Sequence, residues 1–407
     1  MVSETEARRV LEFEEARQIV IDVTRALPQP TGTDIVPLLE AHGRTLAETI
    51  VADRDYPALR RSLRDGFAVR SRDLPGTLRI RGEVRAGESE KAPLQSGEAL
   101  EIMTGAPVPD EADAVVMVEH VTRVEGGAAV KIDRTAEPGQ FINERGSEAK
   151  RLGALIEAHR SIDASHIASL AMAGVSIVPV FGRPRVAILA TGDEIVEVES
   201  TPAPHQIRNS NSFMLASCVL AAGGAPAILP IARDTPEALR ELLQQGLTYD
   251  MLLISGGVSA GRYDLVKPTL KSLGAEFHFE RVRIQPGGPV TFGTVRGRPV
   301  FGLPGNPGSS LITFQLFAQA ALQILSGETH PVLALLRATF EAPFRHKLGL
   351  TRFLPAHLSA DGERLRHIPW QGSSDIPALA KANVFLVAEH DRETWSIGDS
   401  IRVMPKI

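Results

Sequence analysis

Three short apolar runs, each with the pattern of a buried strand, end in loops rich in glycine, proline and carboxylates. Helical patterns at residues 211–222, 235–245, 264–273 and 308–325, with a further strand at 227–231, alternate with these runs. The alternation predicts a parallel sheet with right-handed crossovers. Because parallel strands end at one shared edge, we expect the loops to gather where open α/β folds bind ligands. The runs and their loops are 185–190 with Thr191-Gly192-Asp193-Glu194, 250–254 with Ser255-Gly256-Gly257, and 299–303 with Pro304-Gly305-Asn306-Pro307.

The chain has 407 residues, which is too long for one core and predicts two to four domains. Residues 10–27, 45–51 and 161–173 have helical spacing, the last with Asp163 or Ser165 as its cap. Short β-rich pieces broken by Gly and Pro fill residues 64–134, and alternating strands follow residue 336. The predicted domains are a discontinuous helical and mixed linking domain (1–51 and 137–182), an inserted all-β domain (52–136), a central parallel-sheet α/β domain (183–327) and a small C-terminal β-barrel (328–407).

Composition excludes several classes of protein. A formal charge of −5 disfavours general nucleic-acid or membrane-surface binding, which needs a basic face. The sequence shows neither a signal peptide nor an apolar run long enough to span a membrane. The single cysteine, Cys218, rules out an intramolecular disulfide and fits a reducing compartment, so we expect a cytoplasmic protein. Cys218 lies in an apolar helical run, where a packed, inert thiol is the favoured interpretation.

Three acids each follow a different predicted strand, namely Glu194, Asp234 and Asp264. Taken singly, Glu194 and Asp234 could be helix-start residues, because Thr, Asp and Glu suit a first turn and Pro236 suits the position after a cap. Taken together, they can converge at one edge of the sheet. Mg²⁺ prefers hard oxygen ligands, and it needs few ligands from the protein when it also binds phosphates.

The glycine and proline loops suit an anion. Paired glycines directly after a buried strand, as in Ser255-Gly256-Gly257, let backbone N–H groups approach a phosphate, although a bare turn is the alternative. The loop from Pro304 to Pro307 is stiffened by its prolines before a helix, and a purely structural turn again remains open. Arg64-Asp65-Gly66 and Thr104-Gly105-Ala106-Pro107 in the β-rich section are ordinary turn formers. No zinc, P-loop or nucleophile-elbow motif is present, which disfavours those chemistries.

Six motifs in order resemble the MoeA family of molybdopterin molybdenumtransferases, which is also similar to the C-terminal part of gephyrin. The resemblance runs over nearly the whole chain. One such motif is weak, whereas six in register are specific. They are RDGFAV (64–69), IMTGAPVP (102–109), LATGDEIVE (189–197), ISGGVSAGRYD (254–264), PGGPVTFG (286–293) and FGLPGNPGSS (301–310).

The resemblance implies an elongated homodimer of four-domain subunits with a MogA-like α/β domain that binds the pterin. The β-rich domain of the partner subunit is expected to complete the active cleft. The implied reaction joins molybdate to adenylylated molybdopterin in the presence of Mg²⁺ and releases AMP. The implied further partners are the molybdopterin adenylyltransferase and acceptor molybdoenzymes.

The resemblance also assigns residues, by their positions in these motifs. It gives Glu194, Asp234 and Asp264 as the metal-binding and catalytic acids, and adds Asp65, Thr104 and Arg281 as catalytic. The expected pterin-binding residues are Thr191, Gly192, Asp193, Ser255, Gly256, Gly257, Pro304, Gly305, Asn306, Pro307 and Ser373.

This chain departs from the family pattern mainly in its cations. The family usually has Lys-Pro-Gly-Lys-Pro where this chain has Gln285-Pro286-Gly287-Gly288-Pro289, and a third family lysine is Arg281. The Gly-Arg-x-x-Phe of the last domain reads Gly349-Leu350-Thr351-Arg352-Phe353, so Arg352 or Arg283 could supply charge from a new position. Smaller changes are Arg64 before Asp-Gly and Glu148 where an Asp is expected.

These departures leave alternatives open. The favoured function is insertion of molybdate into adenylylated molybdopterin. A non-catalytic pterin-binding or scaffold protein would explain the lost lysines, and the same chemistry with tungstate or another nucleotide-linked pterin keeps the fold. A metal-dependent phosphohydrolase of unrelated substrate is the remaining alternative.

Overall fold

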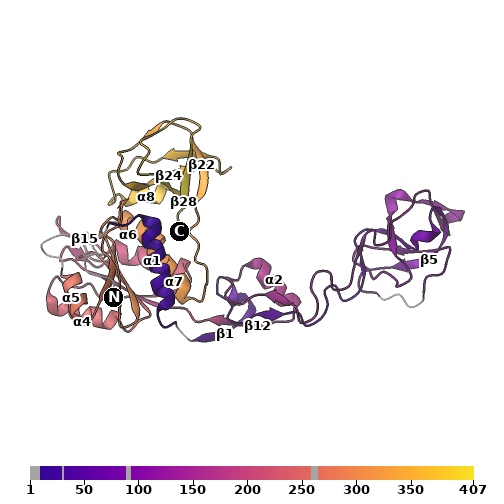
Figure 1. The fold of residues 1–407 in the computed structure, drawn as a ribbon, viewed down its shortest axis with the longest axis horizontal. Coiled ribbons are helices and arrows are strands. Elements are labelled where there is room, and N and C mark those ends of the chain that lie inside the picture. Colours follow the sequence, from indigo (N-terminus) through magenta and orange to yellow (C-terminus); the bar gives the residue numbers. More distant parts are fainter. Residues whose placement is uncertain (1–9, 30–31, 89–92, 258–264) are drawn as a thin grey trace.

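The computed structural model describes residues 10–29, 32–88, 93–257 and 265–407. The molecule is elongated (Figure 1). The α/β domain and the C-terminal domain lie together at one end, a small linking domain lies in the middle, and the β-rich domain lies at the far end.

The α/β domain contains a six-stranded sheet whose first four strands, in sheet order, are parallel, as predicted. The last two strands pair antiparallel, so the expectation of a wholly parallel sheet was wrong at this edge. The tight turn at residues 296–297 explains the difference, because it joins neighbouring strands as a hairpin and no crossover helix intervenes. The strands in sheet order are β16 (Ala225–Ile228), β13 (Arg185–Ala190), β17 (Met251–Ser255), β21 (Arg298–Leu303), β20 (Thr291–Val295) and β18 (Glu276–Phe279).

Alternating strand residues build two cores on opposite faces of this sheet. Ile188 and Leu253 pack on the face covered by α1, α3 and the α6–α7 helix, whereas Leu189 and Leu252 pack on the face covered by α4 and α5. Cys218 is buried in the first core, and burial raises the pKa of its thiol to about 11, which confirms an inert packed cysteine. The helices are α1 (Phe13–Ala26), α3 (Ser210–Ala221), α4 (Pro236–Gly246), α5 (Val266–Ser272), α6 (Pro307–Thr313) and α7 (Gln319–Leu325), with the π-helical turn η5 (Phe314–Ala318) between the last two.

The helical run Pro307–Leu325 has 19 residues and is apolar enough to cross a membrane by length and composition. It is 89% buried inside the protein, which identifies it as a core helix. Its side chains fill the first face of the sheet, with Phe314 and Phe317 fully buried.

The linking domain joins the chain after α1 to residues that follow the β-rich section. Strand β1 (Thr33–Pro37) pairs with β12 (Ile177–Phe181), and β2 (Ile50–Val51) pairs with β11 (Ala154–Ile156). Helix α2 (Ala164–Met172) begins at Asp163, whose side chain accepts from the backbone N–H groups of Ser165 and His166, as predicted.

The predicted helix at 45–51 was wrong. Thr45 and Leu46 instead form isolated bridges with Ser161 and Val180 before β2 begins. Leu46 is fully buried, so pairing with a partner distant in sequence overrides the local helical spacing.

The β-rich domain is all β, as predicted, and contains one six-stranded sheet with two short strands beside it. Fully buried Phe67 and Leu100 lie in separate clusters on its two faces. In sheet order the strands are β7 (Ala114–Met117), β4 (Gly66–Val69), β6 (Glu98–Ile102), β5 (Gly76–Val84), β9 (Ala129–Ile132) and β8 (Thr122–Val124), and β3 (Arg61–Ser62) pairs separately with β10 (Ile142–Asn143).

The C-terminal domain has a barrel-like sheet, because β24 pairs with both β25 and β26 and so closes a ring of strands. Strand β19 (Ile284–Gln285) of the α/β domain pairs with β24 and joins the two domains. The ring strands are β22 (Leu336–Phe340), β24 (Thr351–Leu358), β25 (Arg364–His367), β26 (Val384–Ala388) and β28 (Ser400–Pro405). Outside the ring lie β23 (Phe344–Arg345), paired with β27 (Thr394–Trp395), and helix α8 (Ile376–Lys381).

Candidate functional site

A cavity of about 680 Å³ opens at the carboxyl edge of the central sheet. The loops after β13, β17 and β21 all line it, which confirms that the three loops gather at one edge. Strand-end residues on its wall are Thr191, Gly192, Glu194, Asp234, Ser255, Gly256, Gly257, Pro304, Gly305, Asn306 and Pro307. Of the expected pterin-binding residues in the α/β domain, only Asp193 lies off this wall.

Glycine allows close packing at two points of this wall, and it is required at Gly256, where the neighbouring atom is backbone. A Cβ on Gly256 would lie 2.6 Å from the Thr191 carbonyl oxygen, and the φ of Gly256 is +93°. A Cβ on Gly192 would lie 2.6 Å from a carboxylate oxygen of Glu194. Glycine therefore lets two adjacent loops pack backbone to backbone and lets the Glu194 carboxylate fold against its own loop.

Asn211, in the first turn of α3, ties two of the loops together. Its Nδ2 donates to the Ser255 hydroxyl at 2.8 Å and to the Gly305 carbonyl at 2.6 Å. The sequence reasoning missed Asn211 because a polar residue at a helix start is usually a cap. In the structure Asn209 is the cap, accepting from the Ser212 N–H, and Asn211 is left to hold the loops.

Glu194 and Asp234 both line the cavity and are exposed to it. The helix-start interpretation of Glu194 was wrong, because the short strand β14 (Ile195–Val196) follows it. Asp234 is not the cap of α4 either, since the Thr235 hydroxyl accepts from the Ala238 N–H.

Hydrogen bonds fix Asp234 in place. Its carboxylate accepts from the Thr191 hydroxyl at 2.9 Å, and its backbone N–H donates to Asp193 at 3.3 Å. Asp193, which does not line the cavity, thus holds Asp234 through this hydrogen bond.

The third expected acid, Asp264, lies outside the described residues. Within the parts of the chain that are described, no cluster of three or more His, Cys, Asp or Glu side chains could hold a metal ion. Glu194 and Asp234 are therefore the two carboxylates that the structure brings to the cavity.

The loop from Gln285 to Pro289 forms another part of the wall and presents no cation to the cavity. The cations expected to compensate do not line the cavity. Arg283 forms an ion pair with Glu12 at 3.1 Å, and Arg352 is absent from the wall. Arg281, expected as a catalytic residue, does not line the cavity either. Among the described residues, the cation on the wall is Arg208, which was not predicted from the sequence.

The C-terminal domain closes one side of the cavity with Leu350 and Ser373. The Ser373 hydroxyl accepts from Asn306 Nδ2 at 3.0 Å, and its carbonyl accepts from the Gly308 N–H at 2.7 Å. The loop after β21 is thus fastened to the C-terminal domain, and the expected residue Ser373 lies on the wall.

Asp65 and Thr104 are brought together in the β-rich domain. The Asp65 carboxylate accepts from the Thr104 N–H at 2.6 Å and from the Thr104 hydroxyl at 2.7 Å. These bonds, the hydroxyl first, lower the pKa of Asp65, so the carboxylate is ionised at neutral pH. Within one chain this pair lies at the far end of the molecule from the cavity (Figure 1).

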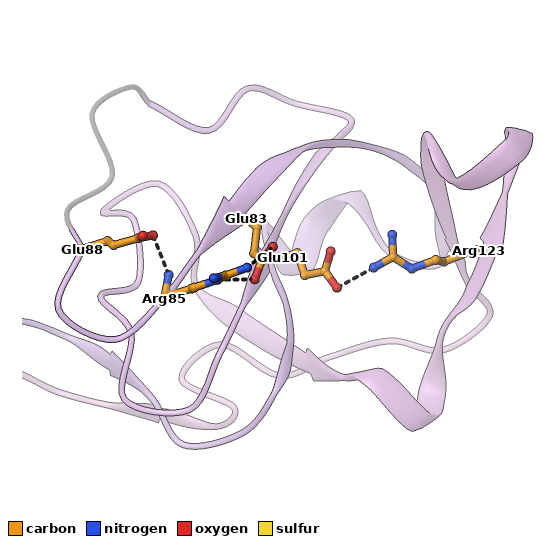
Figure 2. A network of polar contacts seen from close by, with 5 residues as sticks. All are labelled: Glu83, Arg85, Glu88, Glu101 and Arg123. Atoms are coloured by element: carbon orange, nitrogen blue, oxygen red, sulfur yellow. Dashed lines mark hydrogen bonds and ion pairs between the residues drawn. The ribbon is translucent and has the colours of Figure 1, made fainter.

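Two arginines of the same domain, Arg85 and Arg123, are engaged by acids (Figure 2). Arg85 donates to Glu83 at 2.9 Å, which lowers the pKa of Glu83, and its backbone N–H donates to Glu88 at 3.1 Å. Arg123 pairs with Glu101. Arg85 and Arg123 are therefore paired with carboxylates of their own domain.

Comparison with known proteins gives consistent results along the chain. Residues 11–174 match the model of the MoeA N-terminal region (domain I and II), residues 187–324 match a probable molybdopterin binding domain, and residues 337–406 match the MoeA C-terminal region (domain IV).

Relatives and a solved structure extend this match. A molybdopterin molybdenumtransferase of Nostoc sp. is 38% identical over 320 residues, covering 76% of this chain and 73% of that protein. The protein of the same name from Haemophilus influenzae is 30% identical, with 97% and 98% covered. The crystal structure of the molybdopterin biosynthesis MoeA protein of Pyrococcus horikoshii OT3 aligns with a TM-score of 0.79 at 27% identity, covering 98% of this chain and 100% of that one.

Proposed function

The chain belongs to the MoeA family of molybdopterin molybdenumtransferases, and we propose that it inserts molybdate into adenylylated molybdopterin with Mg²⁺ and releases AMP. The observation that carries this proposal is the cavity, where three strand-end loops and two carboxylates meet. Its volume of about 680 Å³ falls in the range of small-molecule sites, about 300–1,000 Å³.

The substrate carries a pyrophosphate, so its site needs hydrogen-bond donors and positive charge. The Gly192 and Gly256 N–H groups donate to the Ala232 and Leu303 carbonyls, so the backbone N–H groups of Gly257 and Gly305 on the wall are the ones suited to phosphate oxygens. Asn209 and Ser210, at the start of α3, lie on the same wall and place the positive end of that helix toward the cavity.

Glu194 and Asp234 fit a magnesium site by their chemistry. Both offer hard oxygen donors to the cavity, and the described residues of the wall include no His or Cys that would favour a softer metal. We assign Mg²⁺ to these two acids and, by the family motif, to Asp264. When bound, the ion would neutralise phosphate charge as it develops.

No side-chain nucleophile is required in this reaction. An oxygen of molybdate or of water attacks a phosphorus of the pyrophosphate linkage, the P–O bond to AMP breaks, and AMP leaves with the electron pair of that bond. Cys218 is excluded as a nucleophile, because it is buried in the core and its pKa is raised. The chain's part is to orient the linkage and stabilise charge.

We also propose that the working unit is a homodimer, because Asp65 and Thr104 could reach a cavity only in another copy. The outer face of the β1–β12 ribbon supports this. Ile35 and Ile177 are 64% and 61% exposed on that face, and Leu39 nearby is 81% exposed. An apolar surface of this kind is typical of an interface.

We place the reaction in the cytoplasm, which the buried reduced cysteine fits. A molybdopterin adenylyltransferase would then supply the substrate, and acceptor molybdoenzymes would take the product.

Incubating the protein with adenylylated molybdopterin, molybdate and Mg²⁺ tests the function, with AMP followed over time. We expect AMP release that requires both Mg²⁺ and molybdate. Substrate binding without AMP release would support a scaffold role, for which the cation-free loop at residues 285–289 is the favouring observation. AMP release that requires tungstate in place of molybdate would identify tungstate as the oxyanion substrate.

A further inference from the structure

We infer that Arg208 is a substrate-binding residue that recognises the phosphate charge of the ligand in this cavity. The inference rests on the proposed function for the identity of the ligand. It assigns a role to a residue outside the motifs that carried the resemblance.

The charges on the cavity wall point to Arg208. Among the described residues that line the cavity, two are acids, Glu194 and Asp234, and one is a cation, Arg208. Two acids and one cation give these residues a net negative charge, which repels a pyrophosphate unless positive charge is placed close to it. Magnesium held by the acids would offset part of the repulsion, and the guanidinium of Arg208 is the cation that the described part of the wall supplies.

Arg208 is held next to Glu194 by the backbone. It lies in β15 (Ile207–Arg208), which pairs in parallel with β14 (Ile195–Val196), and the Ile207 N–H donates to the Glu194 carbonyl at 2.9 Å. Arg208 and Glu194 both line the cavity, on segments that this backbone pairing holds together. A cation and a metal-binding acid on the same wall can contact different oxygens of one pyrophosphate.

The guanidinium of Arg208 is oriented and remains available. Its Nε donates to the Ser200 carbonyl at 3.0 Å, which fixes the direction of the side chain. Within the described part of the chain, the bond to Ser200 is the contact of the Arg208 side chain and no carboxylate pairs with it, and Arg208 is exposed. The terminal nitrogens of the fork are thus free to bind an anion with charge-assisted hydrogen bonds.

Other arginines do not offer the same geometry. Arg283 is engaged by Glu12, and Arg352 is beside Gln285 in the sheet but does not line the cavity. Arg208 therefore provides charge that the loop from Gln285 to Pro289 lacks.

The test compares Arg208→Gln and Arg208→Lys with Arg240→Gln as a control of equal charge change. Arg240 lies on α4 of the same domain, off the cavity wall, and donates to the Ser272 hydroxyl at 2.7 Å. We expect Arg208→Gln to raise the KM for adenylylated molybdopterin about ten- to hundredfold, the effect of losing one charge-assisted contact. Arg208→Lys should recover part of the loss, and Arg240→Gln should match the wild type.

Two further readouts separate charge recognition from a structural role. The salt dependence of KM should be weaker in Arg208→Gln than in the wild type, because fewer charges are paired on binding. Calorimetric titration with AMP alone, which needs no turnover, should show the same loss of affinity. Equal KM, salt dependence and AMP affinity in Arg208→Gln and the wild type, or no AMP binding to the wild type, would overturn the inference. Absence of AMP release by the wild type would instead count against the proposed function.

Discussion

Glu194→Gln and Asp234→Asn should each lower kcat for AMP release by about 10²–10³-fold, because each removes a negative oxygen donor from the proposed magnesium site. Both side chains are exposed on the cavity wall and carry little packing, so the free energy of unfolding should stay close to that of the wild type. Asp234→Asn keeps an oxygen able to accept from the Thr191 hydroxyl, so the loop itself should survive.

Steady-state AMP release and thermal unfolding of the same preparations check this prediction. Glu237→Gln is the matched control, since Glu237 lies in the first turn of α4, is exposed and does not line the cavity. Wild-type rates in Glu194→Gln or Asp234→Asn would remove these acids from the reaction. A similar loss in Glu237→Gln would mean that the effect is not specific to the cavity.

A mixture of Asp65→Asn and Glu194→Gln subunits should be active although each variant alone is nearly inactive. If the β-rich domain of one subunit completes the cavity of the other, a mixed dimer has one site with both wild-type residues. Random pairing of equal amounts then gives about one quarter of wild-type activity, because half of the dimers are mixed and each has one intact site.

The experiment unfolds and refolds the two variants together and measures AMP release by the mixture. Co-expression with different tags gives the purified mixed dimer, which should have about one half of wild-type activity. Asp65→Asn retains the fold if its remaining carbonyl oxygen still accepts from Thr104, which thermal unfolding reports. Activity in the mixture no higher than in either variant alone would mean that Asp65 does not act on the partner's cavity. A monomeric wild type in solution would refute the shared site directly.

The sequence predicted the site edge because parallel strands must end together. Arg185–Ala190 and Met251–Ser255 were located within one residue, and their glycine loops lie on the cavity wall as expected. Buried strands that are apolar throughout have few alternative interpretations. The end of each strand therefore fixes where the following loop begins, so the loops can be placed at the sheet edge without predicting their conformations.

Features that depend on distant partners could not be predicted. Residues 45–51 have helical spacing, yet they pair with strands more than a hundred residues away in sequence. Helix α1 packs on the central sheet, and only the segment after it joins the linking domain. Local patterns hold no information about which of two cores a helix covers.

The cation of the wall was missed for a similar reason. Arg208 stands in a short strand whose position depends on pairing with the residues after Glu194, and neither strand has the length that reveals a strand in a sequence. Comparison with the family drew attention to Gln285 and Gly288, where lysines were expected. The replacement charge enters from a different side of the cavity.

The account's central claim is that Glu194 and Asp234 hold a divalent ion against a nucleotide-linked pterin in one cavity. Electron paramagnetic resonance of Mn²⁺, used in place of Mg²⁺, measures this directly in the wild type and in Glu194→Gln with adenylylated molybdopterin present. The account predicts one tightly bound ion per subunit in the wild type, with its affinity much reduced in Glu194→Gln. Equal Mn²⁺ affinity and stoichiometry in the two proteins would contradict it.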